Sequence, residues 1–495
     1  MNKFHWVVVL LVLLSSIAIR CYWAVQKEGM HIDEVATFSI SECDGAFYSP
    51  DVFFEENVKL TGKELKNMYF IHDTRLKGTL HDVRYMWYNI WVRDHTNFYY
   101  TLIRVFFAGS DTTDIKIIQL RGIAFNILVY ILSFFVFLKI LLLYFKDRLL
   151  SSLATLTCFA FMTGGISNTI FIRTYELQML MVLLLAYWLT VIIQKKDNGL
   201  WKYNCRNFFI TALALTGVLW TGYFMFVLVA VFGLFLLWRL YRDGELVKGS
   251  VFFTGTMLCA LALCRLLYLS YFNGFYNDER ISEKFELSVW LTTFTDSVST
   301  WAVLMLRNTL YLPVLALLCL AALVSWKNRK SLPWVFMPAL VYTFIVMLLS
   351  PYKTNRYMVA ATPLLLLVIP VVSGWVKNRK LRLVFLISIT SIYIVRAMFK
   401  SNIDNLFMFP ESSKYLKVRD RNIHIIQKSR WLLMSLMPVM EDDIKYCLSN
   451  TLHCNEIKSG DIVLYGITKD EKPETIPVNY KEIVKSGYYT YYMVE

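Results

Sequence analysis

Long apolar segments recur along most of the chain and constrain its fold more than any other feature. Hydrophobic residues make up 57% of the 495 positions and charged residues only 18%, whereas a soluble protein carries about 25% charged residues. About 20 consecutive apolar residues in a helix cross the hydrocarbon core of a bilayer. The sequence therefore predicts a polytopic α-helical membrane protein with about 11–13 transmembrane helices.

The first span is expected at residues 6–25, uncleaved, because Arg20 follows the apolar run and no small-residue cleavage site is present. Segment 96–108 is too short to cross at 1.5 Å per residue. It is tilted, extended or re-entrant, which leaves the number of crossings open by one. Further spans are expected at 117–145, 149–163, 174–193, 207–221, 222–240, 248–272, 308–325, 332–349, 356–375 and 382–399.

The charges of the loops predict the orientation. Basic clusters at 195–206, 327–330 and 377–382 should face the cytoplasm, and the acidic cluster at 278–286 should lie outside. The net charge of +14 then reflects cytoplasmic loops and contacts with membrane lipids, and does not indicate nucleic-acid binding. Because eukaryotic sorting motifs are absent, we expect a bacterial inner (plasma) membrane.

Two regions stand apart from the spans. Within a membrane domain at 1–399, the first external loop, 26–95, is amphipathic and aromatic around Trp87, which predicts interfacial helices; an ordinary soluble loop is the alternative. The tail, 400–495, is expected to form a small soluble α/β region outside the membrane. There Cys447 and Cys454 can form a disulfide, or remain two unlinked thiols.

Asp33 and Glu34 follow the first span directly. A carboxylate near a low-dielectric boundary can act as a general base toward a hydroxyl. The alternative is a solvated helix start, where acidic residues favour the positive end of the helix dipole. Asp94 and His95 lie directly before the short segment 96–108, again at the expected external interface of the membrane. Asp94 can equally be an N-cap there.

Arginine and tyrosine together open two later spans, on the side of the membrane where Asp33 is expected. They are Arg173 with Tyr175, and Arg356 with Tyr357, with Lys353 close by. A guanidinium at that depth suits a phosphate, which it can bind with two hydrogen bonds. Anchoring at the interface by snorkelling is the alternative.

A base candidate and two phosphate-binding candidates on one side indicate a reaction between a lipid-linked phosphate substrate and an acceptor hydroxyl. Attack at the anomeric carbon of a sugar expels a lipid phosphate, which an arginine can stabilise without a divalent ion. No carboxylate cluster and no cysteine spacing predicts a metal site. No cofactor is expected beyond the lipid-linked sugar phosphate, which is the donor substrate.

These motifs resemble, in order and place, the GT-C glycosyltransferases, in particular the prokaryotic dolichyl-phosphate-mannose-protein mannosyltransferase-like family. The resemblance covers roughly residues 5–375. Its motifs are the acidic pair after the first span, an acidic-His stretch leading into aromatic residues, an Arg-x-Tyr, and an Arg-Tyr before a late apolar run. The residues that carry them are Asp33-Glu34, Asp94-His95 with Tyr99, Arg173 with Tyr175, and Arg356-Tyr357.

The chain departs from the family at His95-Thr-Asn97, where relatives show His-Pro-Pro. It also has Gly222-Tyr223 where relatives often carry His-Tyr, and Phe171 where a Glu commonly precedes the Arg-x-Tyr. The resemblance implies a GT-C fold, a polyprenyl-phosphate-sugar donor, and a lipid, glycan or protein acceptor bound outside.

The resemblance also implies inversion at the anomeric carbon, with Asp33 as the base and Glu34 and Asp94 in support. Arg173 and Arg356 become the phosphate ligands. The remaining residues expected to bind substrate are His95, Tyr99, Tyr175, Tyr223, Lys353 and Tyr357. Two other readings stay open: a lipid-sugar flippase or transporter, and a ligase that uses a diphosphate-linked glycan.

Overall fold

A computed structural model describes most of the chain, as two compact units that we treat separately. The helical unit comprises Met1–Ala24, Trp87–Tyr99 and Ile123–Asp404, and the mixed unit comprises Val25–Met86, Tyr100–Gly122 and Asn405–Glu495. The described residues are 3–42, 58–70, 73, 75–88, 96–110, 114–276, 287–304, 332–350, 354–404, 406, 413–426, 430–449, 457–466, 479–486 and 489–495.

Within the described residues, five helices are long and apolar enough to cross a membrane. They are α1 (Lys3–Gln26), α6 (Ile115–Phe145), α9 (Tyr175–Asp197), α11 (Met225–Arg242) and α12 (Leu246–Leu267). A sixth candidate is the pair α7 (Leu149–Ala160) and α8 (Thr163–Thr169), which is bent by 48°. These helices have the length and composition expected of a polytopic membrane protein.

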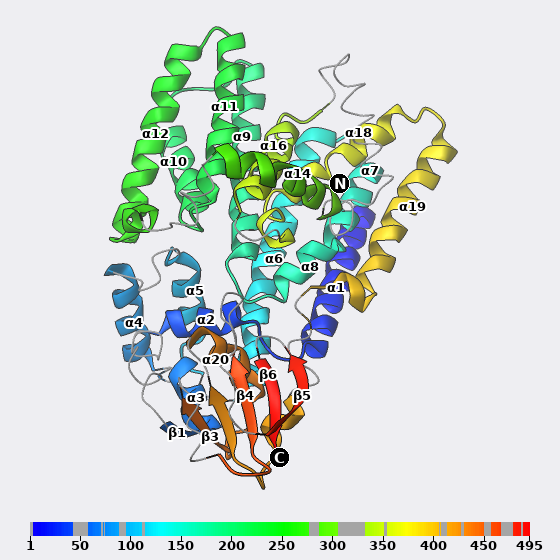
Figure 1. The fold of residues 1–495 in the computed structure, drawn as a ribbon. Coiled ribbons are helices and arrows are strands. Elements are labelled where there is room, and N and C mark those ends of the chain that lie inside the picture. Colours follow the sequence, from blue (N-terminus) through cyan, green and yellow to red (C-terminus); the bar gives the residue numbers. More distant parts are fainter. Residues whose placement is uncertain are drawn as a thin grey trace. The chain divides into compact units, whose positions relative to one another are not determined.

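The helical unit contains further helices (Figure 1). They are α10 (Cys205–Leu219), η2 (Tyr271–Tyr276), α14 (Leu287–Leu304), α16 (Phe336–Leu349), η5 (Asn355–Tyr357), α17 (Thr362–Leu365), α18 (Val368–Trp375), α19 (Arg379–Ala397) and η6 (Lys400–Asn402). Helices lie at all the predicted spans except 308–325, which is outside the described residues.

Two of the predicted spans differ in detail from the structure. The helix expected to continue to residue 272 ends at Leu267, because Tyr268 is extended and the chain turns into η2. The segment expected as one helix at 356–375 is divided into η5, α17 and α18. Pro370 accounts for the second break, because its ring lacks an N–H and clashes with the carbonyl four residues earlier, at Leu366.

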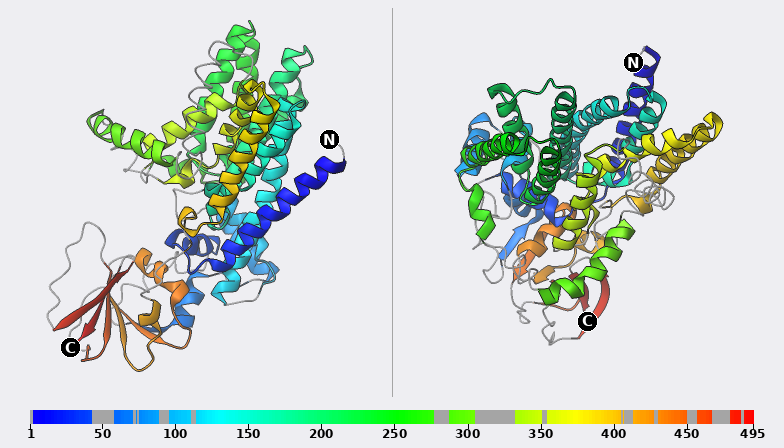
Figure 2. Two further views of the ribbon diagram at one scale, coloured as in Figure 1. Left: turned by 90° about the vertical axis from the view of Figure 1, so that its right-hand side faces the viewer. Right: turned by 90° about the horizontal axis from the view of Figure 1, so that it is seen from above.

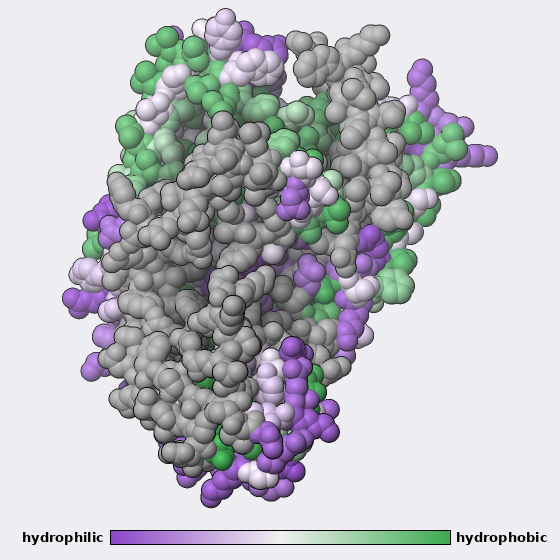
Figure 3. Space-filling view, in the orientation of Figure 1, coloured by the Kyte–Doolittle hydropathy of each residue, from purple (hydrophilic) through white to green (hydrophobic). Residues whose placement is uncertain are grey.

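Large apolar side chains face outward from the helices, as membrane contact requires. In the face seen in Figure 3, hydrophobic residues gather over α10, α11 and α12. Leu213, Leu234 and Leu258, one from each of these helices, are all exposed.

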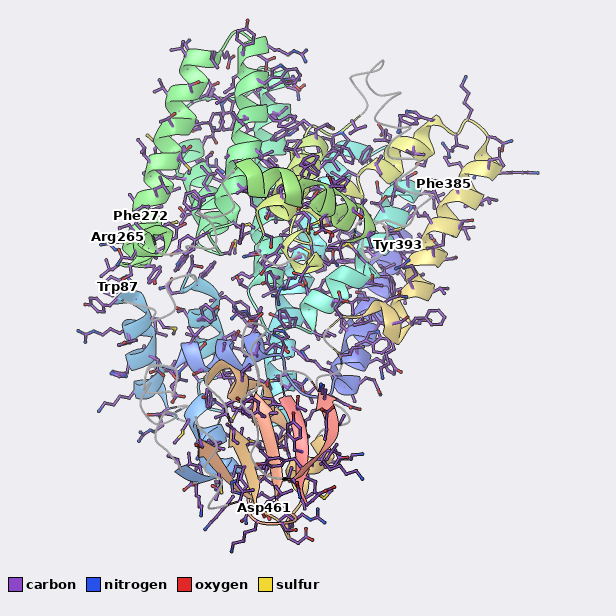
Figure 4. The ribbon with its side chains drawn as sticks, in the orientation of Figure 1. Trp87, Arg265, Phe272, Phe385, Tyr393 and Asp461 are labelled. Atoms are coloured by element: carbon purple, nitrogen blue, oxygen red, sulfur yellow. The ribbon has the colours of Figure 1, made fainter. Side chains whose placement is uncertain are left out.

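Near the end of α12 the backbone carbonyl of Leu266 accepts a hydrogen bond of 2.6 Å from the indole N–H of Trp87. Figure 4 labels Trp87 with Arg265 beside it.

The mixed unit is built on a six-stranded sheet with the order β1-β3-β2-β4-β6-β5. Strand β2 is parallel to both of its neighbours, while the outer pairs are antiparallel. Figure 2 shows the strands side by side. Their bounds are β1 (Val58–Thr61), β2 (Ile423–Ile426), β3 (Lys445–Ser449), β4 (Ile462–Gly466), β5 (Tyr480–Ser486) and β6 (Tyr489–Val494).

Strand β1 comes from segment 26–95, where no strand was predicted from the sequence. It pairs with β3 in antiparallel register, with Lys59 opposite Cys447. The predicted strands near 459–465 and 488–494 are present as β4 and β6. Cys454 lies outside the described residues, so the disulfide stays a prediction.

Asp461, labelled in Figure 4, closes the turn that leads into β4. Its carboxylate accepts hydrogen bonds from the backbone N–H of Lys458 at 2.9 Å and from the side chain of Asn422 at 3.2 Å. The Nε2 atom of His424 lies 3.1 Å from the same carboxylate. Asp461 and His424 are both buried, so they fasten β4 to β2.

The remaining helices of the mixed unit are short. They are α2 (Ile32–Ser41), α3 (Gly62–Tyr69), α5 (Phe98–Phe106), η7 (Ser413–Lys417), α20 (Arg430–Leu436) and η8 (Met437–Val439). Helix α4 (Leu76–Tyr88) exposes Leu76 and Leu80 and buries Asp82, whose carboxylate accepts a 2.6 Å hydrogen bond from buried Arg104. That this helix lies at the membrane interface stays a prediction.

Candidate functional site

The acidic pair lies at the start of α2, immediately after the turn that ends α1. Gly29 has φ = 76°, a conformation that favours glycine, and lets the chain reverse there. His31 is the N-cap of α2: its Nδ1 accepts a hydrogen bond from the N–H of Asp33 at 3.1 Å. Glu34 completes a capping box by accepting the N–H of His31 at 2.8 Å.

Glu34 is fully buried and paired. Its Oε1 lies 2.5 Å from the Nζ of Lys27, and both side chains are completely enclosed. Burial lowers the pKa of Lys27 below its usual value, and the nearby Glu34 carboxylate opposes that change. The second carboxylate of the sequence motif is therefore enclosed with a cation inside the turn.

Asp33 lies in a different environment. Its side chain is 26% exposed, and its Oδ2 is 3.6 Å from the Nδ1 of His31. The same nitrogen accepts the backbone N–H of Asp33. Of the two carboxylates, Asp33 is the one that solvent reaches.

Contacts within the mixed unit hold the turn between α1 and α2. Lys116 donates through its Nζ to the carbonyls of Val25 at 3.0 Å and Lys27 at 2.7 Å. Gln119 donates to the carbonyl of Gly29 at 3.1 Å. The bond to Val25 satisfies a carbonyl that the end of α1 leaves open, and all three bonds fix the backbone that leads to Asp33.

A second cluster, in the helical unit, surrounds the guanidinium of Arg356. Its carbon lies 5.5 Å from the ring centroid of Phe171, 5.8 Å from that of Tyr175 and 5.3 Å from that of Tyr357. The rings of Phe171 and Tyr175 are nearly parallel, 8° apart at 6.1 Å, and Tyr175 meets Tyr357 edge-on at 5.8 Å. We call these four residues the Arg356 cluster. Three aromatic rings stabilise and orient one cation there.

The loop between α8 and α9 supplies Phe171 and leads to Tyr175. Asn126, inside α6, donates through its side-chain amide to the carbonyls of Thr169 at 3.1 Å and Phe171 at 2.9 Å. Tyr99 in turn donates to the amide oxygen of Asn126 at 2.9 Å. Tyr99 is thus buried in the network that supports the loop, at 1% exposure.

The structure also places the remaining predicted residues of the helical unit. Arg173 is buried in the same loop, where its backbone N–H donates to the backbone carbonyl of Phe171 at 2.8 Å. Tyr223 precedes α11 and donates through its hydroxyl to the carbonyl of Tyr271 at 2.8 Å. Its neighbour Phe224 packs on Tyr357 at 5.7 Å, so this turn adjoins the Arg356 cluster.

Three predicted site residues, Asp94, His95 and Lys353, lie outside the described residues. In the described part of the chain, no group of three or more His, Cys, Asp or Glu side chains could hold a metal ion. Sequence reasoning missed Lys27 and Asn126. A polar side chain inside an apolar run, as Asn126 is, is the signal that could have found the second.

Compared with models of protein families and with curated proteins, the chain gives no match.

Proposed function

We propose that the chain is a membrane glycosyltransferase of the GT-C superfamily, in the prokaryotic dolichyl-phosphate-mannose-protein mannosyltransferase-like group. It moves a sugar from a polyprenyl-phosphate donor to an acceptor hydroxyl at the extracytoplasmic face of the membrane. The observation that carries the proposal is the separation of the acidic pair. Glu34 is enclosed with Lys27, while Asp33 is open to solvent.

Asp33 acts as the general base in this proposal. It takes the proton of the acceptor hydroxyl, whose oxygen then forms a bond to the anomeric carbon. The bond from that carbon to the phosphate oxygen breaks, and polyprenyl phosphate leaves with the electron pair. Attack from the face opposite the leaving group inverts the anomeric carbon.

Arg356 and Arg173 are the proposed ligands of the leaving phosphate. Three aromatic rings surround the guanidinium of Arg356, and the faces of such rings stabilise a cation. Charge that develops on the phosphate oxygen is stabilised by a cation already in place. This supports a donor that carries a phosphate next to the sugar.

The test compares wild type with Asp33→Asn in detergent, supplied with a mixture of polyprenyl-phosphate hexoses and pentoses. We expect release of free polyprenyl phosphate to fall at least about a hundredfold, or about 2.7 kcal/mol of barrier. Asp442→Asn is the matched control, because that half-exposed carboxylate pairs with Lys66 on α3. Equal release by wild type and Asp33→Asn would show that Asp33 is not the base.

A further inference from the structure

Arg20 is a buried cation inside the first candidate membrane span, and the proposed function does not use it. Its side chain has no exposed surface. One terminal nitrogen donates to the carbonyls of Ser16 at 3.0 Å and Ala160 at 2.8 Å, and its Nε donates to the hydroxyl of Thr169 at 3.1 Å. The guanidinium carbon lies 3.5 Å from the ring centroid of Tyr130. A charged side chain within a membrane span costs free energy, and residues of this kind have a functional role as a rule.

Thr169 connects this cation to a buried acid. Its hydroxyl lies 3.0 Å from the Oε2 of Glu176, which also has no exposed surface. Thr169 is the last residue of α8, and Glu176 lies in the first turn of α9. Arg20 thus reaches both ends of the loop at 170–174 through one hydroxyl.

The loop and the residue that follows it carry half of the Arg356 cluster. Phe171 lies two residues after Thr169, and Tyr175 lies one residue before Glu176. A shift of either end of the loop would change the parallel stacking of the two rings, and with it their contact with Arg356. The loop has little room to adjust, because Asn126 already binds two of its carbonyls.

Stability alone is a weak explanation for this network. Apolar side chains can often replace a buried ionic group with no loss of stability, provided that both partners are removed. What distinguishes the network is its position, since its members bracket the loop beside the Arg356 cluster.

We propose that Arg20, acting through Thr169 and Glu176, positions this loop and so sets the affinity of the Arg356 cluster for the phosphate of a lipid-linked ligand. The three are positioning residues and do not touch the ligand. The inference rests on the proposed function for the identity of the ligand, and on the contacts above for the coupling.

The test measures equilibrium binding of a polyprenyl monophosphate to the full chain in nanodiscs of zwitterionic lipid. Thr169→Val keeps the volume and branching of the side chain and removes only the bridging hydroxyl. We expect it to bind at least about tenfold more weakly, since small displacements at a preorganised site are costly. Thr169→Ser restores the hydroxyl and should bind as wild type does.

Thr190→Val is the matched control. Thr190 is also buried, and its hydroxyl donates to the carbonyl of Ala186 at 2.7 Å and contacts Tyr144 in another helix at 3.0 Å. Thr190 lies far along α9 from the loop, so removing its hydroxyl should leave the affinity for polyprenyl monophosphate within about twofold of wild type. Equal weakening by Thr190→Val would overturn the inference.

Arg356→Gln separates the inference from the proposed function. If it weakens binding while Thr169→Val binds as wild type does, the network has no positioning role and the phosphate site stands. If Arg356→Gln leaves binding unchanged, the phosphate site itself is wrong, and the inference falls with it.

Discussion

Replacing Lys27 by methionine tests the buried pair of Lys27 and Glu34, which adjoins the proposed base Asp33 in the sequence. Methionine nearly fills the volume of lysine but leaves the carboxylate of Glu34 without its cation. Both side chains are fully enclosed and the charged atoms are 2.5 Å apart, so solvent cannot compensate. Removing one partner of such a pair costs about 3–5 kcal/mol, because a buried charge is left unpaired. We therefore expect Lys27→Met to lower the free energy of unfolding by about that amount.

The assay is equilibrium unfolding of the purified chain in mixed micelles. Lys66→Met is the control, because Lys66 pairs with Asp442 at 2.7 Å but the carboxylate is half exposed. Such a pair contributes about 0–1 kcal/mol. Adding Glu34→Gln to Lys27→Met should recover most of the loss, since it removes the unpaired charge and keeps an acceptor for the N–H of His31. A double variant no more stable than Lys27→Met would refute the electrostatic reasoning.

Two further outcomes are expected. Arg104→Leu leaves the buried carboxylate of Asp82 without its guanidinium, so amide hydrogens of α4 should exchange faster with solvent, while those of β4 should not. Val58 and Leu448 are opposite each other in the register of β1 and β3, so the double variant Val58→Cys, Leu448→Cys should form an interstrand disulfide on oxidation. The disulfide is detected as a gel mobility shift, which neither single variant should show.

The helices of the chain were predictable because their signal is local. A run of apolar residues long enough to span a bilayer specifies a helix, since every backbone polar group in lipid must be satisfied within its own segment. The breaks were harder to foresee. Pro370 lies inside an apolar run, and the interruption before it depends on where the helix would otherwise place the carbonyl of Leu366.

The candidate site was predictable only in part. The position of Asp33-Glu34 after a span drew attention to the pair, but their different surroundings depend on Lys27, which is brought back by the turn at Gly29. Likewise Arg356 lies far along the chain from Phe171 and Tyr175. Proximity of that kind comes from tertiary packing, which a single sequence does not encode in any local pattern.

The order in which the protein is made has a consequence for strand β1. Its four residues leave the ribosome long before β3, the strand that pairs with it, is synthesised. Until then β1 has no partner within the sheet, and its N–H and C=O groups are open to other extended chains. A chain truncated before residue 445 should therefore present this strand to chaperones or to other nascent copies.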